Sequence, residues 1–278
     1  MARLRSLLFV PGDRPERMEK ALSLGADALI LDLEDAVAPT AKPAAREMVA
    51  AFLATERRAT LFVRINPLDS GLSDDDLAAI LPGRPDGIML PKAEGAASLA
   101  ALDGKLTDDI KILPIASETP AAIFALGSYG GVTPRLCGLT WGAEDLPAAI
   151  GAQTSREPDG SYTAPYQLAR SLTLFGAHAA GVPAIETVYP DFRDLDGLAA
   201  YAARGRRDGF TGMMAIHPTQ IPVINAAFAP SETEIAHARA VVAIFAANPG
   251  AGALSLDGRM IDRPHLVQAQ RILGLAGG

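Results

Sequence analysis

The stretch ILPIASETP, residues 112–120, is a short apolar run that ends in polar residues, with Glu118 close behind it. The stretch LCGLTWGAEDL, residues 136–146, repeats this arrangement and places Glu144 and Asp145 after an apolar run. Both runs are apolar without alternation, which predicts strands buried on both faces, as in a parallel sheet covered by helices. The two stretches therefore predict successive strands whose carboxyl ends carry acids.

Eight such runs alternate with segments of helical periodicity along the chain. The expected strands are Leu7–Val10, Ala28–Leu33, Leu61–Ile65, Gly87–Leu90, Ile112–Ala116, Leu136–Thr140, Ala184–Thr187 and Gly212–Ile216. The expected helices between them are Glu16–Leu24, Ala44–Ala54, Asp74–Leu81, Ala96–Leu102, Pro120–Leu126, Tyr166–Ala180 and Leu195–Arg207. Eight strand–helix units in 278 residues fit an α/β fold of the (β/α)8 TIM-barrel type better than an open sheet.

The last part of the chain exceeds what a barrel needs. Helical segments at Thr219–Phe228 and Glu232–Ala246 precede a turn rich in helix-breaking residues, Asn248–Gly252, and a tail from Leu256 to Leu273. Such an appendage can dock on its own barrel or on that of a neighbour. We therefore expect a TIM-barrel catalytic domain over residues 1–228 and a C-terminal helical extension over residues 229–278.

The composition favours a small ligand. With 49% apolar residues the chain can bury a sizeable core, and its net charge of -7 argues against a general affinity for nucleic acid or anionic membranes. The single cysteine, Cys137, lies in an apolar run and allows no internal disulfide, which suits a reducing cytoplasm. The apolar start is broken by Pro11-Gly12 and is too short for a signal peptide or membrane span, so we expect a cytoplasmic protein.

Polar or ionisable side chains follow all eight expected strands. In chain order they are Asp13 and Arg14; Asp32, Glu34 and Asp35; Arg64 and Asn66; Lys92; Glu118; Glu144 and Asp145; Thr187; and His217. Exposure to solvent explains part of this pattern, because strand ends are commonly polar. Barrel enzymes, however, carry out their chemistry at this end of the barrel, and several acids opposite an arginine and a lysine indicate such a site.

Glu118 and Asp145 lie one strand–helix unit apart, so their side chains can approach one divalent ion. Oxygen ligands without paired cysteines or closely spaced histidines favour Mg²⁺ or Mn²⁺ over zinc, and Mg²⁺ commonly takes only one or two protein carboxylates. The alternative is that both acids cap helices or are solvated loop charges. Glu118 before Thr119-Pro120 indeed resembles a helix start.

Arg64 ends an apolar strand, where an unpaired cation is costly. It calls for a planar anion, which is either a substrate carboxylate or an acid at the rim such as Glu34. Asp32, Glu34 and Asp35 cannot all remain charged and unpaired close together, so at least one of them is expected to pair with a basic group or to order water around a metal.

Two further features have more than one interpretation. Basic residues concentrate near the N-terminus, where they either bind a phosphate-bearing group or, as with Glu16 and Lys20, form ordinary helix pairs. These residues are Arg3, Arg5, Arg14, Arg17 and Lys20. His217 before Pro218 is either a satisfied core or rim histidine or a base.

Five motifs in this order resemble the citrate lyase beta-subunit-like (CitE-like) branch of the HpcH/HpaI aldolase family, which includes malyl-CoA and citramalyl-CoA lyases. They are RSLLFVPGD (residues 5–13), LDLEDAV (31–37), VRINP (63–67), GAEDL (142–146) and IHP (216–218). The segment GRMIDRP, residues 258–264, also resembles the lid segment of that family. The resemblance covers nearly the whole chain.

The resemblance implies roles for individual residues. Glu118 and Asp145 match the Mg²⁺ ligands, and Arg64 matches the arginine that faces the reacting oxygens of the substrate. Positions that match those holding the CoA portion are Phe9, Arg14 and Lys20. Asp262 matches a lid aspartate that, in relatives, enters the site of the adjacent subunit and acts in proton transfer. The resemblance therefore implies a homo-oligomer, commonly a trimer or hexamer.

The implied activity is that of a carbon–carbon lyase acting on a 3-hydroxyacyl-CoA thioester such as malyl-, citramalyl- or citryl-CoA. The bond is cleaved or formed by a Claisen-type reaction through an acetyl-CoA enolate, whose oxygen Arg64 would stabilise. Asp262 would protonate the enolate carbon, or take the proton in the condensation direction. Met213 departs from the pattern, since many relatives have a lysine at that position, and Ser117 is also unusual.

Three other functions remain open from the sequence. A citrate lyase beta subunit would act on a thioester of an acyl carrier protein and would need partner subunits. A pyruvate aldolase would act on free 2-keto acids, which the CoA-matching positions disfavour. A silent assembly subunit would not need the acids and Arg64 that this chain retains.

Overall fold

A computed structural model describes residues 3–55, 59–107 and 109–276. The chain forms two compact units, Met1–Ala227 and Phe228–Gly278.

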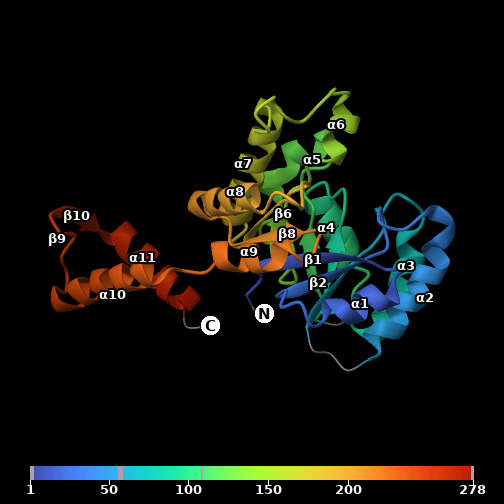
Figure 1. The fold of residues 1–278 in the computed structure, drawn as a ribbon, viewed down its shortest axis with the longest axis horizontal. Helices are drawn as coiled ribbons and strands as arrows, with labels where there is room; N and C mark the ends of the chain where they lie inside the picture. Colours follow the sequence, from blue (N-terminus) through green and yellow to red (C-terminus); the bar gives the residue numbers. More distant parts are fainter. Residues whose placement is uncertain (1–2, 56–58, 108, 277–278) are drawn as a thin grey trace. The chain divides into compact units, whose positions relative to one another are not determined.

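The first unit is built on eight parallel strands (Figure 1). They are β1 (Ser6–Pro11), β2 (Ala28–Asp32), β3 (Thr60–Arg64), β4 (Gly87–Leu90), β5 (Lys111–Pro114), β6 (Leu139–Thr140), β7 (Ala184–Glu186) and β8 (Gly212–Ala215). Their order in the sheet is β5-β4-β3-β2-β1-β8-β7-β6. Isolated parallel bridges from Ile112 to Leu136 and from Ile115 to Thr140 join the two edges. The predicted TIM barrel is therefore confirmed.

Helices and short 3₁₀ turns connect the strands on the outside of the barrel. The helices are α1 (Pro15–Ala21), α2 (Lys42–Leu53), α3 (Ser73–Ile80), α4 (Ala96–Asp103), α5 (Pro120–Ala125), α6 (Asp145–Ile150), α7 (Ala164–Ala179), α8 (Leu195–Asp208) and α9 (Gln220–Ala227). The 3₁₀ turns are η1 (Pro39–Ala41), η2 (Leu81–Gly83) and η3 (Leu126–Ser128). Among the helices of the described chain, none is long and apolar enough to cross a membrane.

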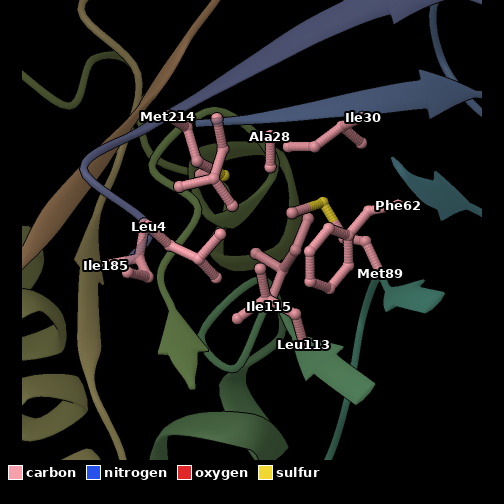
Figure 2. Packing of buried hydrophobic residues seen from close by; sticks show 10 residues of the cluster. Leu4, Ala28, Ile30, Phe62, Met89, Leu113, Ile115, Ile185 and Met214 are labelled. Atoms are coloured by element: carbon pink, nitrogen blue, oxygen red, sulfur yellow. The ribbon is translucent and has the colours of Figure 1, made fainter. Parts of the chain in front are cut away.

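The barrel interior is filled by apolar side chains from its strands and from the segment just before β1. Figure 2 shows this cluster, which comprises Leu4, Leu7, Ala28, Ile30, Phe62, Met89, Leu113, Ile115, Ile185 and Met214. Burying one such large side chain contributes about 1.5–3 kcal/mol relative to exposing it. Cys137 packs against the cluster, and burial raises the pKa of its thiol to about 12. The cysteine is therefore part of the packed interior, as its apolar surroundings in the sequence predict.

The second unit contains α10 (Glu232–Ala247), a hairpin of β9 (Ala253–Leu256) and β10 (Arg259–Asp262), and α11 (Arg263–Ala276). Ser231 and Glu234 form a capping box at the start of α10. The hairpin adds two short strands to the C-terminal helical extension expected from the sequence. Its turn is Asp257-Gly258, where both residues have positive φ angles, of 50° and 74°, as a two-residue hairpin turn requires.

Candidate functional site

A cavity of about 320 Å³ opens at the carboxyl ends of the barrel strands. Residues that the sequence singled out and that line it are Phe9, Asp32, Asp35, Arg64, Glu118, Glu144, Asp145 and Thr187. Apolar side chains of Ile115, Val188, Met214 and Ile216 contribute to its wall. The parallel arrangement of the strands brings these residues together, although the lining extends in the sequence from Phe9 to Ile216.

Glu118 follows β5 and is 3% exposed. It is not the cap of α5, because that role belongs to Thr119, whose hydroxyl accepts a hydrogen bond from the Ala122 N–H. Its Oε2 instead accepts a hydrogen bond of 2.6 Å from the backbone N–H of Lys92. Burial raises the pKa of Glu118 to about 8, against the hydrogen bond from Lys92, and the negative charge of Asp145 adds to the rise. The carboxylate is therefore held where negative charge is unfavourable unless a cation compensates it.

Asp145 is the first residue of α6, and its Oδ1 lies 3.3 Å from the ammonium nitrogen of Lys92. The residue before it, Glu144, caps the helix without a side-chain hydrogen bond. Glu118 and Asp145, which the sequence predicts at one site, thus both line the cavity. The Glu118 carboxylate does not cap a helix; it contacts the β4–α4 loop at Lys92.

This pair of acids fits a magnesium ion. Glu118 and Asp145 line one cavity, and burial, together with the negative charges of Asp145 and Glu34, raises the pKa of Glu118. Within the described ranges, no group of three or more His, Cys, Asp or Glu residues is placed to hold a metal ion. Two carboxylates, with remaining positions left to water and substrate oxygens, match the way Mg²⁺ is commonly bound and not the closed protein cage of a structural zinc site.

Arg64 lies opposite these acids at the end of β3. Its Nε and Nη2 donate to the two oxygens of Asp32 at 2.8 and 2.6 Å, and its Nη1 is 2.9 Å from Glu34 Oε2. Burial alone would lower the pKa of Arg64, but its hydrogen bonds to Asp32 and the charges of Asp32, Glu34 and Asp35 raise it above its usual range. The guanidinium also lies 4.9 Å over the ring of Phe9. Arg64 is therefore fixed by a structural ion pair and at the same time lines the cavity.

The two buried acids at the end of β2, Asp32 and Glu34, are paired with cations, and the third acid, Asp35, is mostly exposed. Asp32 also accepts hydrogen bonds from the backbone N–H groups of Glu34 and Ala36. Burial raises the pKa of Glu34, while the nearby cations of Arg64 and Lys92 act in the opposite direction. Asp35 stays mostly exposed, with 3.9 Å to the Arg64 guanidinium. The expectation that at least one of these acids pairs with a basic group is confirmed.

Lys92 is the residue of this network whose importance the sequence did not reveal. Its ammonium is 2.8 Å from Glu34 Oε1 and 3.3 Å from Asp145 Oδ1, while its backbone N–H binds Glu118. The position after β4 was visible in the sequence as one polar strand end among eight. Its bridging role depends on a positive φ of 49° at Lys92, which no sequence pattern indicates.

The basic N-terminal cluster is divided in the structure, which corrects the idea of a single patch. Arg5 precedes β1 and forms an ion pair of 2.7 Å with Asp27, at the amino end of the barrel. Arg14 follows the carboxyl end of the same strand, 3.7 Å from Asp13. Within the described chain, Arg14 and Lys20 are exposed and do not line the cavity.

Met213 lies in β8, and His217 follows the carboxyl end of the same strand. The half-buried ring of His217 stacks on Phe192 at 4.6 Å, and its Nδ1 lies 2.8 Å from Thr219 Oγ1, so it is a rim histidine. Met213 is fully buried in β8, whereas the next residue, Met214, lines the cavity. Because successive strand residues face opposite sides, a basic side chain at position 213 would point away from the cavity.

Asp262 ends β10 in the second unit. Its Oδ1 lies 2.6 Å from His265 Nδ1, and this hydrogen bond lowers the pKa of the aspartate. The carboxylate is thus ionised and partly exposed on that unit.

Comparison with known proteins agrees with this geometry. Residues 5–218 match the model of the HpcH/HpaI aldolase/citrate lyase family. A citrate lyase subunit beta-like protein of Mycobacterium tuberculosis is 38% identical over 270 residues, which cover 97% of this chain and 94% of that protein. A (3S)-malyl-CoA thioesterase of Cereibacter sphaeroides is 36% identical over 277 residues, covering 98% of this chain and 94% of the relative.

The fold of a relative is similarly close. The crystal structure of protein CitE from Mycobacterium tuberculosis, in complex with magnesium, acetoacetate and coenzyme A, gives a TM-score of 0.86 at 37% identity, and the match covers 100% of this chain and 99% of that one. The agreement extends over both the barrel and the C-terminal unit. The chain therefore belongs to the HpcH/HpaI aldolase/citrate lyase family.

Proposed function

We propose that this chain is a cytoplasmic, Mg²⁺-dependent lyase that cleaves or forms a carbon–carbon bond in a 3-hydroxyacyl-CoA thioester such as malyl-, citramalyl- or citryl-CoA. The observation that carries the proposal is the meeting of Glu118, Asp145 and Arg64 at one cavity. A relative solved with magnesium and coenzyme A, and another named for malyl-CoA, support this substrate class.

Glu118 and Asp145 would hold the ion, with Mn²⁺ as an alternative to Mg²⁺. When bound, the ion supplies Lewis-acid polarisation of substrate oxygens. The two acids would orient the ion, because both are held in place. Glu118 accepts a hydrogen bond from the Lys92 N–H, and Asp145 is the first residue of α6. The acids of the β2–α2 loop hold the two cations of the site in place through ion pairs. Asp32, Glu34 and Asp35 pair with Arg64, and Glu34 also pairs with Lys92.

Arg64 would stabilise the negative charge that develops on the thioester oxygen when the enolate forms. The bidentate pair with Asp32 fixes the plane of the guanidinium before the substrate arrives, so no reorganisation is needed during the reaction. An arginine carries five N–H donors, and the hydrogen bonds to Asp32 engage one on Nε and one on Nη2, so N–H groups remain for the substrate; Nη1 lies 2.9 Å from Glu34 Oε2 as an ion pair.

The CoA portion of the substrate is proposed to bind at Phe9, Arg14 and Lys20. Phe9 lines the cavity, Arg14 follows the carboxyl end of β1, and Lys20 is an exposed cation in the last turn of α1. Asp262 is proposed to move the proton at the enolate carbon, from the adjacent subunit of a homotrimer or hexamer. Exposed apolar side chains on the C-terminal unit, Met260 at 68% and Val267 at 65%, support a partner that covers them.

Hydrolysis of the thioester is the second candidate activity, because a relative at 36% identity is named a (3S)-malyl-CoA thioesterase. The two reactions differ in their products. Carbon–carbon cleavage releases acetyl-CoA and a 2-oxoacid, whereas hydrolysis releases free CoA and a hydroxy acid.

The test is to incubate purified protein with malyl-, citramalyl- and citryl-CoA, with Mg²⁺ or with EDTA, and to quantify all four products. We expect acetyl-CoA and 2-oxoacid from at least one thioester, only with the ion. Glu118→Gln is expected to lower the rate by at least about 10²-fold. The exposed Glu157→Gln provides the matched control and should be unaffected.

Metal-dependent release of CoA without acetyl-CoA would replace the lyase by the thioesterase. Absence of any product would contradict the choice of a CoA thioester and would point to an acyl-carrier-protein substrate. Normal turnover of Glu118→Gln would overturn the assignment of the metal site.

A further inference from the structure

Lys92 touches both acids that we propose as metal ligands. Its backbone N–H donates to Glu118 Oε2 at 2.6 Å, and its ammonium lies 3.3 Å from Asp145 Oδ1. The ammonium also pairs with Glu34 Oε1 at 2.8 Å. A single side chain and its own amide thus contact three carboxylates, each belonging to a different strand end.

The backbone at Lys92 is held in an unusual conformation. Its φ of 49° lies in the left-handed region, which is costly for residues other than glycine. The buried hydroxyl of Tyr129 fixes the loop, because it donates to the Ala93 carbonyl and accepts from the Gly95 N–H, each at 3.0 Å. The position of Lys92 is therefore imposed by the loop, unlike that of an ordinary surface lysine.

The charges around Lys92 give its ammonium a particular task. Arg64 is already engaged by Asp32 and Glu34. Among the residues that the structure describes, Lys92 is the cation that pairs with Asp145. An ion that binds Asp145 would share that carboxylate with the ammonium, and the two positive charges would repel each other.

We propose that Lys92 is the counter-ion of Asp145 and competes with the divalent cation for that carboxylate. This inference rests on the proposed metal site and adds a control on its affinity: the site holds its ion more weakly than two uncompensated acids would. Coulomb's law predicts that removing one positive charge so close to a divalent ion tightens binding on the order of tenfold, even at the dielectric constant of water.

The experiment is titration calorimetry of Mg²⁺ into the full-length protein without substrate, at pH 8.5 to limit competition by protons. Lys92→Met removes the ammonium and leaves the backbone N–H that binds Glu118. We expect its Kd to fall about tenfold, and Lys92→Arg, which restores the charge, to stay within about twofold of wild type. Lys105→Met is the matched control, because it breaks an exposed 2.7 Å ion pair with Asp74 away from the cavity, and should leave the Kd unchanged.

Lys92→Gly is the second variant, since glycine accepts the positive φ without strain and should fold at least as stably. It too is expected to bind Mg²⁺ more tightly than wild type. Equal or weaker binding by both variants, while wild type binds the ion, would overturn the inference and leave the proposed function intact. Absence of Mg²⁺ binding in wild type would overturn the proposed function itself, and the inference with it.

Discussion

Gly142 is the residue that allows the two candidate ligand acids to share one cavity. A Cβ at this position would lie 2.7 Å from Glu118 Cγ and 3.1 Å from its Oε1. Its φ is outside the left-handed region, so the need for glycine here comes from space and not from backbone conformation. The lack of a side chain at 142 thus fixes where the carboxylate of Glu118 can lie.

Gly142→Ala is expected to displace the Glu118 carboxylate while the barrel remains folded. A shift of this kind costs about 10²-fold in kcat/KM, because catalytic groups tolerate only small misplacement. Steady-state kinetics at saturating Mg²⁺, with the thermal unfolding midpoint as a check on folding, would measure it. Gly127→Ala is the control, since a Cβ there meets nothing within 4 Å. Full activity of Gly142→Ala would mean that Glu118 adjusts without loss.

The sequence predicted the acids better than it predicted their partners. Glu118, Asp145, Asp32 and Arg64 could be assigned to one site because parallel strands bring their carboxyl ends together, whatever the details of the loops. Lys92 could not be singled out, because its bridging position depends on the loop conformation that Tyr129 stabilises. The role of a side chain can be predicted from the sequence when it depends on the order of the strands, but not when it depends on one φ angle.

At the scale of elements, β7 contributes a buried acid that the sequence did not mark. Glu186 is fully buried and accepts hydrogen bonds from Trp141, Tyr201 and Arg170. These donors come from the segment after β6 and from helices α7 and α8, so one carboxylate joins three elements. Trp141 directly precedes Gly142, and the network therefore supports the segment that carries Asp145.

Arg170→Met is expected to destabilise the protein by about 3–5 kcal/mol, because it leaves the buried Glu186 without its cationic partner. Trp141 is the only tryptophan and lies in the network, so its fluorescence during urea unfolding reports the change. Arg207→Met, at a side chain 73% exposed, is the control and should stay within about 0.5 kcal/mol of wild type. Equal effects of the two substitutions would show that Trp141 and Tyr201 suffice to stabilise the acid.

Strands of the barrel were predictable because each is buried on both faces and reads as a continuous apolar run. The hairpin β9–β10 was not recognised, because each of its strands is only four residues long. The signal that could have found it is Asp257-Gly258, a dipeptide typical of a two-residue hairpin turn. Helix α6 was missed for a related reason: it has only six residues, one of them Pro147.

At the scale of the whole molecule, the two compact units divide the proposed chemistry. The barrel unit carries Arg64 and the two acids proposed as ion ligands, and the C-terminal unit carries Asp262. In a cyclic homo-oligomer, a site that takes its barrel from one subunit and Asp262 from the next would be completed only by assembly. The assignment of Asp262 and that of the oligomer therefore stand or fall together, and one experiment addresses both.

Hybrid oligomers of Glu118→Gln and Asp262→Asn subunits are expected to regain activity that neither variant has alone. If each site combines two adjacent subunits, random mixing in equal amounts gives about a quarter of all sites an intact Glu118 and an intact Asp262, and in a hybrid trimer freed of the homo-oligomers about one site in three is intact. Co-expression with two different affinity tags and sequential purification yields the hybrids, whose specific activity is then compared with wild type. Glu118→Gln mixed with Asp145→Asn is the control, because both defects lie in the same barrel and no arrangement repairs them. Activity in the control as well would show that the recovered activity does not come from sites shared between subunits. No recovery in the test hybrid would mean that Asp262 serves its own barrel or takes no part in the reaction.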